Sequence, residues 1–226
     1  MADVLAEKNA VKDKDVLDAL LDRCGQSFAA EAGIRLADRP QPLYQLLVLA
    51  TLLSARISSG VAVAAARELF AAGCRTPRDM ARASRQDRVD ALGRGHYRRY
   101  DERTSTMLGD GAELLLDRWK GDLRRLRDEA GGDPGRIGEL LREFPGIGPT
   151  GADIFLREVQ GVWPQVAPHL DRRVLDGAAR LGLPRQERGL ARLARSGDDL
   201  VRLSAALVRV SHDKKAADEV RAAAAG

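Results

Sequence analysis

Apolar residues recur every three or four positions along most of this chain, a spacing that places them on one face of an α-helix. It predicts a first helix over residues 14–32. After a break at Arg39-Pro40-Gln41-Pro42, the run Leu43–Leu53 is apolar nearly all round, as in a helix buried at the centre of a domain. Further helices are predicted over residues 60–71, 77–82, 85–92, 102–119, 122–129, 136–143, 149–159, 171–181, 186–195 and 198–211. No segment shows the alternation of a β-strand, so we expect an all-α fold.

A turn rich in glycine and proline separates two of these predicted helices. Residues 144–152 read Phe-Pro-Gly-Ile-Gly-Pro-Thr-Gly-Ala. Gly146 and Gly148 allow a tight turn and bring backbone N–H groups close to an anion, because no Cβ stands in the way. Pro149 suits the first turn of the next helix, whose positive end also attracts an anion, and Ile147 can anchor the turn in the core. The turn therefore predicts a backbone clamp for a phosphate.

A lone carboxylate follows this turn along the chain. Asp171 precedes the predicted helix 171–181, and Arg172 and Arg173 follow it directly. An aspartate in this place caps the helix, and it can also face a substrate. His169 stands two residues earlier, where it meets a phosphate or a base or simply belongs to the loop.

Charge and cysteine content narrow the class of protein. The chain has 226 residues, a net charge of +4 and an isoelectric point near 9.3. This favours a polyanionic partner, although arginine carries the excess and arginine preference also arises in a GC-rich genome. No apolar run is long enough to span a membrane, and acidic residues stand where a signal peptide has none. Cys24 and Cys74 are isolated, so we expect a cytoplasmic protein without a membrane partner, a metal or a cofactor.

Together these motifs resemble the helix-hairpin-helix DNA glycosylase superfamily, the endonuclease III-like proteins. In that family a Gly/Pro-rich loop follows the hairpin and leads to an essential aspartate whose helix ends in Arg-Leu-Gly-Leu. Residues 161–168 supply the loop, and Arg180–Leu183 carry that ending at the expected distance from Asp171. Upstream, Leu52-Leu53-Ser54-Ala55-Arg56 resembles the family's Leu-Leu-Ser-Ala-Gln. The resemblance covers roughly residues 40–185.

The resemblance implies a two-lobed helical fold with a helix-hairpin-helix motif. A six-helix lobe over residues 40–150 would contain the first helix and the hairpin of the motif. Residues 1–39 and 151–226 would form the second lobe, with the catalytic aspartate, and the substrate cleft would lie between the lobes. The implied partner is double-stranded DNA containing a damaged or mismatched base, and a monomer is usual in the family.

The implied activity is base excision by hydrolysis of an N-glycosidic bond. Asp171 would stabilise the positive charge at the sugar and orient or deprotonate the attacking water. Thr150 occupies the position where bifunctional members have a lysine, and it cannot form a Schiff base. The Thr150 hydroxyl would position water, contact the sugar or form a hydrogen bond within its own helix. No lysine lies between residues 121 and 213, which predicts a monofunctional enzyme. Many relatives hold an iron–sulfur cluster with four cysteines, which this chain does not supply.

Several residues are candidates for DNA contacts. The hairpin backbone at Gly146, Ile147 and Gly148 would hold a phosphate. The family's residue at the place of Arg56 fills the gap left by the extruded base, although a surface arginine after a buried helix is equally ordinary. The loop Gly95–Arg103 resembles the family's Gly-x-Tyr loop, which presses on the opposite strand. Its candidates are His96 and Tyr97, with Tyr97 or Tyr100 either stacking on a base or packing beneath the next helix. In the second lobe the candidates are His169 and Arg172.

Three other functions stay open at this stage. One is a bifunctional glycosylase with lyase activity, which would cleave the strand without alkali and be trapped by borohydride. Another is a non-catalytic helix-hairpin-helix protein that binds DNA without altering it. The third is a helical protein that serves as an interaction module and whose arginines are merely solvated surface residues. In that case, binding to duplex DNA would show no dependence on salt.

Overall fold

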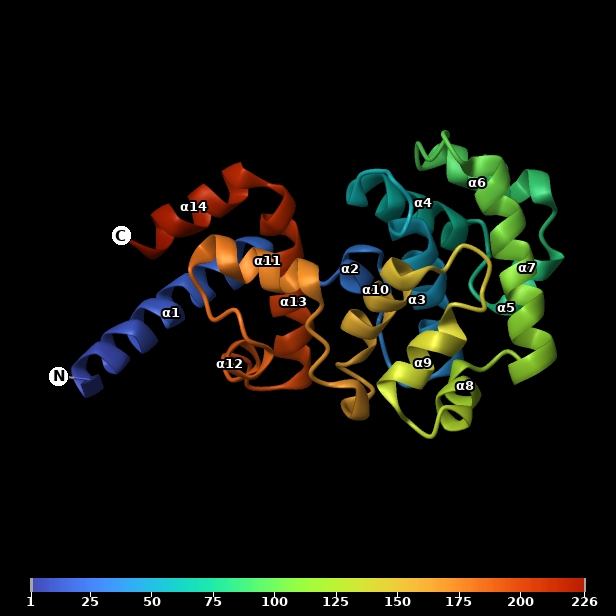
Figure 1. Ribbon diagram of the computed structural model, residues 1–226. Coiled ribbons are helices and arrows are strands. Elements are labelled where there is room, and N and C mark those ends of the chain that lie inside the picture. The colour runs from blue at the N-terminus through green and yellow to red at the C-terminus, as the bar shows by residue number, and fades with distance from the viewer. Residues whose placement is uncertain (1, 226) are drawn as a thin grey trace. The chain divides into compact units, whose positions relative to one another are not determined.

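The computed structural model describes the backbone of residues 2–225 and the side chains of residues 13–225. Throughout these residues the regular structure is helical and contains no strand, which confirms the expected all-α class (Figure 1). The chain divides into two compact units. The larger unit is Phe28–Val166, and the smaller unit combines Met1–Ser27 with Ala167–Gly226.

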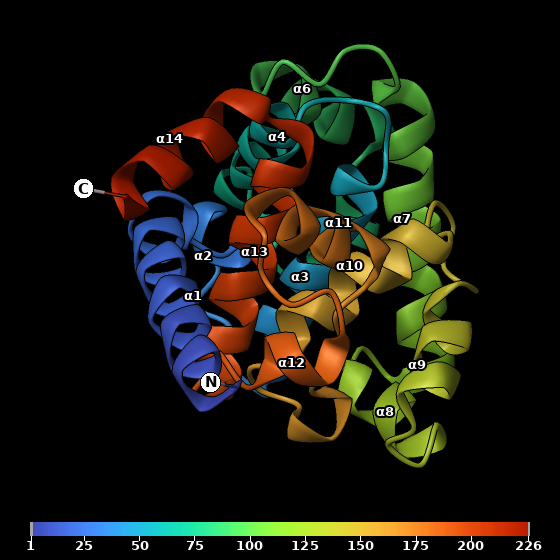
Figure 2. The same cartoon turned by 60° about the vertical axis from the view of Figure 1, so that its left-hand side comes forward.

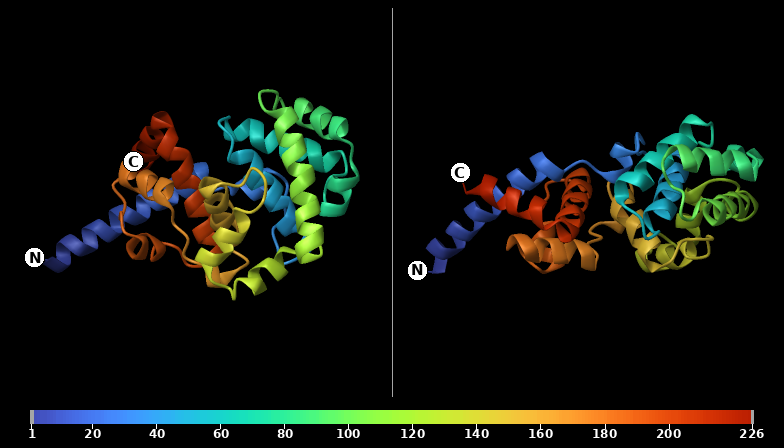
Figure 3. Two further views of the ribbon diagram at one scale, coloured as in Figure 1. Left: turned by 45° about the vertical axis from the view of Figure 1, so that its right-hand side comes forward. Right: turned by 90° about the horizontal axis from the view of Figure 1, so that it is seen from above.

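In the larger unit the central element is α3 (Pro40–Leu53), which packs against α4, α7, α8 and α10 (Figures 1 and 2). Its side chains from Leu46 to Leu52 are all buried, as the apolar run predicts. The other helices of this unit are α2 (Phe28–Glu31), α4 (Ser59–Ala71), α5 (Pro77–Arg82), α6 (Arg85–Arg94), α7 (Asp101–Trp119), α8 (Leu123–Glu129), α9 (Pro134–Leu141) and α10 (Pro149–Val159), with a 3-10 turn at Pro164–Val166. Figure 3 shows the long α7 beside the shorter α5 and α6.

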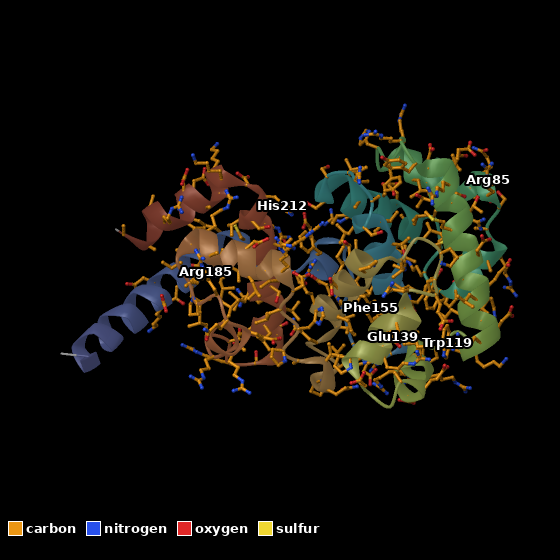
Figure 4. The ribbon with its side chains drawn as sticks, in the orientation of Figure 1. Arg85, Trp119, Glu139, Phe155, Arg185 and His212 are labelled. Atoms are coloured by element: carbon orange, nitrogen blue, oxygen red, sulfur yellow. The ribbon has the colours of Figure 1, made fainter. Side chains whose placement is uncertain are left out.

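Aromatic rings and one buried carboxylate hold the larger unit together. Phe155 on α10 meets Trp163 edge to face, with ring centroids 5.8 Å apart. Trp119 at the end of α7 stacks on Phe144 at 5.5 Å (Figure 4 labels Phe155 and Trp119). Glu158 is only 2% exposed and accepts hydrogen bonds from the backbone N–H groups of Phe28 (3.2 Å) and Ala29 (2.9 Å). This carboxylate therefore fixes the start of α2 against α10.

The smaller unit is built around α13 (Gly197–His212), which packs against α11, α1 and α14 (Figure 1). Its other helices are α1 (Ala2–Cys24), α11 (Arg172–Leu181), α12 (Glu187–Ala191) and α14 (Lys214–Ala224). Helices α11 and α13 approach closely at Gly177, where an added Cβ would lie 2.1 Å from the carbonyl oxygen of Leu207. Only glycine allows α11 to lie this close to the backbone of α13.

The prediction of one helix over residues 14–32 is wrong. Helix α1 ends at Cys24, and the separate helix α2 begins at Phe28. Arginines of α13 bind carbonyls at the end of α1 and directly after it: Arg209 donates to Cys24 O (3.0 Å) and Arg202 to Gly25 O (3.2 Å). Cationic side chains commonly satisfy the free carbonyls at a helix end in this way. Periodicity does not show such contacts from distant side chains.

The units differ in extent from the lobes that the resemblance implies. Residues 28–39 and 151–166 lie in the larger unit. Two carboxylates hold these segments in the larger unit. One is Glu158, and the other is Asp38, whose carboxylate accepts from Trp163 Nε1 at 2.9 Å and pairs with Arg127 at 3.0 Å. These bonds connect the loop after α2 to the segment after α10. Helix α14 had not been predicted, and α12 is shorter than the predicted 186–195.

Candidate functional site

The turn between α9 and α10 is held by one buried side chain. Ile147 is 5% exposed, and its N–H donates to the Phe144 carbonyl at 3.0 Å, so Ile147 anchors the turn as expected. Gly146 has φ +85°, a conformation that strains any L residue, and an added Cβ would lie 3.0 Å from the sulfur of Met107. Glycine at this position is therefore required by the turn itself.

Gly148 matches one of the two roles expected of it, the open backbone, but is not needed for the tight turn. Its φ of −97° and ψ of −169° are ordinary extended backbone, so the tight turn does not require glycine here. No atom lies within 4 Å of an added Cβ, so the space beside this backbone is open. Gly148 is also the N-cap of α10, and within the described residues no side chain caps this helix. The turn thus presents the positive end of α10 with unobstructed backbone beside it.

The segment that ends in Arg56 lies directly beside this turn. Helix α3 packs against α10, and the hydroxyl of Ser54 after α3 shares its one hydrogen between Thr51 O at 2.7 Å and Gly146 O at 3.1 Å. The Cβ of Ser54 would lie 3.4 Å from a Cβ at Gly151 in the first turn of α10. Arg56 is exposed in the turn that follows Ser54. Two motifs far apart in the sequence therefore form one surface of the larger unit.

Thr150 is half-buried at the second position of α10, immediately after Pro149. A hydroxyl in the first turn of a helix can bond locally or point to a ligand. Its position next to Gly148 and Gly151 places it on the same end of α10 as the open backbone.

The loop after α6 exposes His96 but buries Tyr97. Gly95 packs so closely on α4 that an added Cβ would lie 2.4 Å from the Cα of Ala65. Tyr97 is 2% exposed and its hydroxyl lies 3.2 Å from that of Thr104 on α7, so of the two alternatives for this side chain the structure shows the ring packed beneath the next helix. Burial raises the pKa of Tyr97. His96 is exposed with φ +64°, and Arg98 beside it is also exposed.

Asp171 belongs to the smaller unit, whereas the turn and Arg56 belong to the larger unit. Asp171 is half-buried and caps α11, accepting a hydrogen bond from Val174 N–H at 3.1 Å. Arg172 projects into solvent with its side chain 94% exposed, 4.0 Å from Asp176. His169 is half-buried before the helix. The structure thus confirms that Asp171 caps α11.

Sequence reasoning missed the role of Ser54, although this residue lies within the quoted Leu-Leu-Ser-Ala-Arg motif. Its contact with Gly146 depends on the packing of α3 on α10, which no local pattern reports. Across the described side chains, no group of three His, Cys, Asp or Glu residues is placed to hold a metal ion. None of the helices described here is both long and apolar enough to cross a membrane.

Comparisons with protein-family models, with curated proteins and with solved structures found no match for this chain. The geometry of the two units is therefore the basis for assigning a function.

Proposed function

We propose that this protein is a monofunctional DNA glycosylase of the helix-hairpin-helix type, which removes a damaged or mismatched base from double-stranded DNA. The observation that carries the proposal is the hydrogen bond from Ser54 to Gly146, at 3.1 Å. This hydrogen bond joins the turn that contains Arg56 to the turn between α9 and α10, which we call the glycine turn. These are the two segments that a glycosylase of this type needs on one DNA-binding surface.

The glycine turn suits a DNA phosphate. Its backbone beside Gly148 is open, and the uncapped first turn of α10 directs partial positive charge toward that space. A phosphate bound there would accept from backbone N–H groups, which fixes the protein on the strand without reading its sequence. Ile147 supports this role because its buried side chain holds the turn in place.

Arg56 suits the task of filling the space left by an extruded nucleotide. Its side chain is exposed, and its turn is held by Ser54 against the phosphate-binding turn. A guanidinium beside a bound phosphate could enter the base stack and donate to the unpaired base on the opposite strand. In the same unit, His96 and Arg98 are further exposed groups for contacts with the DNA backbone.

The chemical step would use Asp171 and a water molecule. The bond between C1′ and the base nitrogen breaks, the electron pair leaves with the base, and positive charge develops on the sugar. The Asp171 carboxylate stabilises that charge and accepts a proton as the water oxygen bonds to C1′; that proton then passes to the departing base, which restores the carboxylate. The products are a free base and an abasic site, and His169 and Arg172 would bind phosphates near the same helix start.

The residue at the position of the family's lyase lysine favours hydrolysis over a lyase reaction. A bifunctional enzyme needs a lysine to attack C1′, and Thr150 stands at that position. Lys120 is the lysine of the larger unit, and it lies at the end of α7, where its ammonium donates to Asp117 O at 2.9 Å. Thr150 can instead hold the attacking water or contact the sugar.

The test uses end-labelled duplexes that each carry one alkylated, oxidised, deaminated or mismatched base. We expect base release from at least one of them, with strand cleavage only after alkali. Cleavage without alkali, together with trapping by borohydride, would refute the monofunctional assignment. Salt-dependent DNA binding without base release from any duplex would indicate a binding protein and refute the enzyme assignment.

A further inference from the structure

The larger unit has a second cationic feature, away from the glycine turn. A groove of about 950 Å³ is bordered by the loop after α2, the start of α3, the end of α4 and the segment that follows α4. Four arginines line it: Arg35, Arg39, Arg67 and Arg75. Its apolar lining includes Leu36 and Pro42. We call this feature the arginine groove.

No acidic side chain lines the arginine groove. Asp38 lies in the same loop, but its carboxylate is bound to Trp163 and Arg127. Arg67 donates to the backbone carbonyl of Glu31, and Arg75 donates to that of Phe70 at 2.9 Å. Among the described residues, none of the four groove arginines forms an ion pair with a carboxylate. The groove therefore concentrates positive charge that the protein itself does not neutralise.

The arginine groove is separate from the proposed DNA-binding surface. It lies where α3 begins and α4 ends, whereas Arg56 lies in the turn where α3 ends and α4 begins. Helix α3 has 14 residues, so its two ends are about 20 Å apart. Helix α3 also begins without a side-chain cap, so its positive end adds to the charge of the groove.

We propose that the arginine groove binds an acidic peptide segment of a partner protein, one that carries apolar side chains between its carboxylates. Arginine pairs with carboxylates through two parallel hydrogen bonds, and the groove offers four such side chains. The apolar lining provides contacts for the peptide's apolar side chains. A chain of phosphates would leave this apolar lining without contacts. This proposal does not depend on the glycosylase activity.

The lining argues against a single nucleic-acid strand in the same place. Proteins that hold single strands stack the bases on exposed aromatic rings. Phe70 is the aromatic residue of the lining, and it is only 6% exposed. An extended peptide with both carboxylates and apolar side chains fits the charge and the apolar lining of the groove.

The experiment measures binding of a fluorescein-labelled peptide in which Asp and Glu alternate with Leu and Phe. Two controls accompany it: the same peptide with Asn and Gln in place of the acids, and a short DNA duplex. The groove variant is Arg35→Glu with Arg39→Glu. A matched variant, Arg78→Glu with Arg125→Glu, makes the same charge change at exposed positions of the same unit outside the groove.

We expect the acidic peptide to bind more tightly than its amide copy. The groove variant should weaken binding about a hundredfold, since each lost charged hydrogen bond is worth about tenfold. The matched variant should weaken binding far less. Equal binding of the acidic and amide peptides, or equal losses in the two variants, would overturn the proposal. A groove variant that loses duplex binding but keeps peptide binding would assign the groove to nucleic acid and also overturn it.

Discussion

The close contact between α11 and α13 predicts the effect of Gly177→Ala. The new Cβ would lie 2.1 Å from the carbonyl oxygen of Leu207, whereas real Cβ atoms do not approach other atoms within 3.0 Å. The obstacle is backbone inside a helix and cannot swing aside, so the two helices must separate by about 1 Å. Overpacking of this kind costs about 1–3 kcal/mol, and the better helix propensity of alanine returns up to about 1 kcal/mol. We expect a net loss of about 1–2 kcal/mol in the free energy of unfolding.

Thermal unfolding followed by circular dichroism measures this change, with Gly93→Ala as the matched control. Gly93 is also helical, but no atom lies within 4 Å of its added Cβ, so that variant should keep or slightly raise the Tm. Gly177→Ala should lower the Tm by several degrees. Because Asp171 begins the same helix, displacement of α11 should also slow base release, by up to about a hundredfold. A Tm for Gly177→Ala equal to that of the native protein would refute the reasoning.

Other predictions concern buried or paired groups. Glu158→Ala leaves the amides at the start of α2 without their acceptor and should lower the free energy of unfolding by about 3 kcal/mol in chemical denaturation; a loss below about 1 kcal/mol would contradict this. Hydrogen bonds from Arg118 and then Trp119 lower the pKa of Glu129, so its contribution to stability is lost as pH falls through that lowered pKa. The Tm difference between the native protein and Glu129→Gln should therefore shrink in acid, and a constant difference would exclude this linkage. Burial raises the pKa of the Cys74 thiol, so it should react with a thiol reagent at neutral pH only after unfolding, and rapid reaction of the folded protein would show otherwise.

Periodicity was sufficient to predict most of the helices. The predicted helices at 77–82 and 149–159 agree with α5 and α10, because their starts carry proline and their apolar faces are buried. The helix predicted over 14–32 is interrupted because Arg209 and Glu158, both distant in sequence, end one helix and begin the next. Local patterns contain no information about such partners.

The candidate site was partly predictable for the same reason. Gly146 and Ile147 have the turn-forming and anchoring roles that their residue types indicate. Tyr97 was ambiguous because a tyrosine beside arginines can either pack in a core or stack on a base, and only its packing against Thr104 distinguishes the two. The contact between Ser54 and Gly146, and the arginine groove, depend on how α3 packs against its neighbours.

The central claim is that Asp171 performs the chemistry and does not merely cap α11. The direct test is single-turnover base release by the native protein, Asp171→Asn and Asp213→Asn on a duplex that the native protein processes. Asparagine caps a helix as well as aspartate, so both variants should fold normally. Asp213 is a matched control because it caps α14 in the same unit, accepting from Ala216 N–H at 3.1 Å as Asp171 accepts from Val174 N–H at 3.1 Å.

We predict that Asp171→Asn keeps DNA binding and loses base release by about a hundredfold or more, whereas Asp213→Asn releases the base at the native rate. Base release by Asp171→Asn at the native rate would contradict the account.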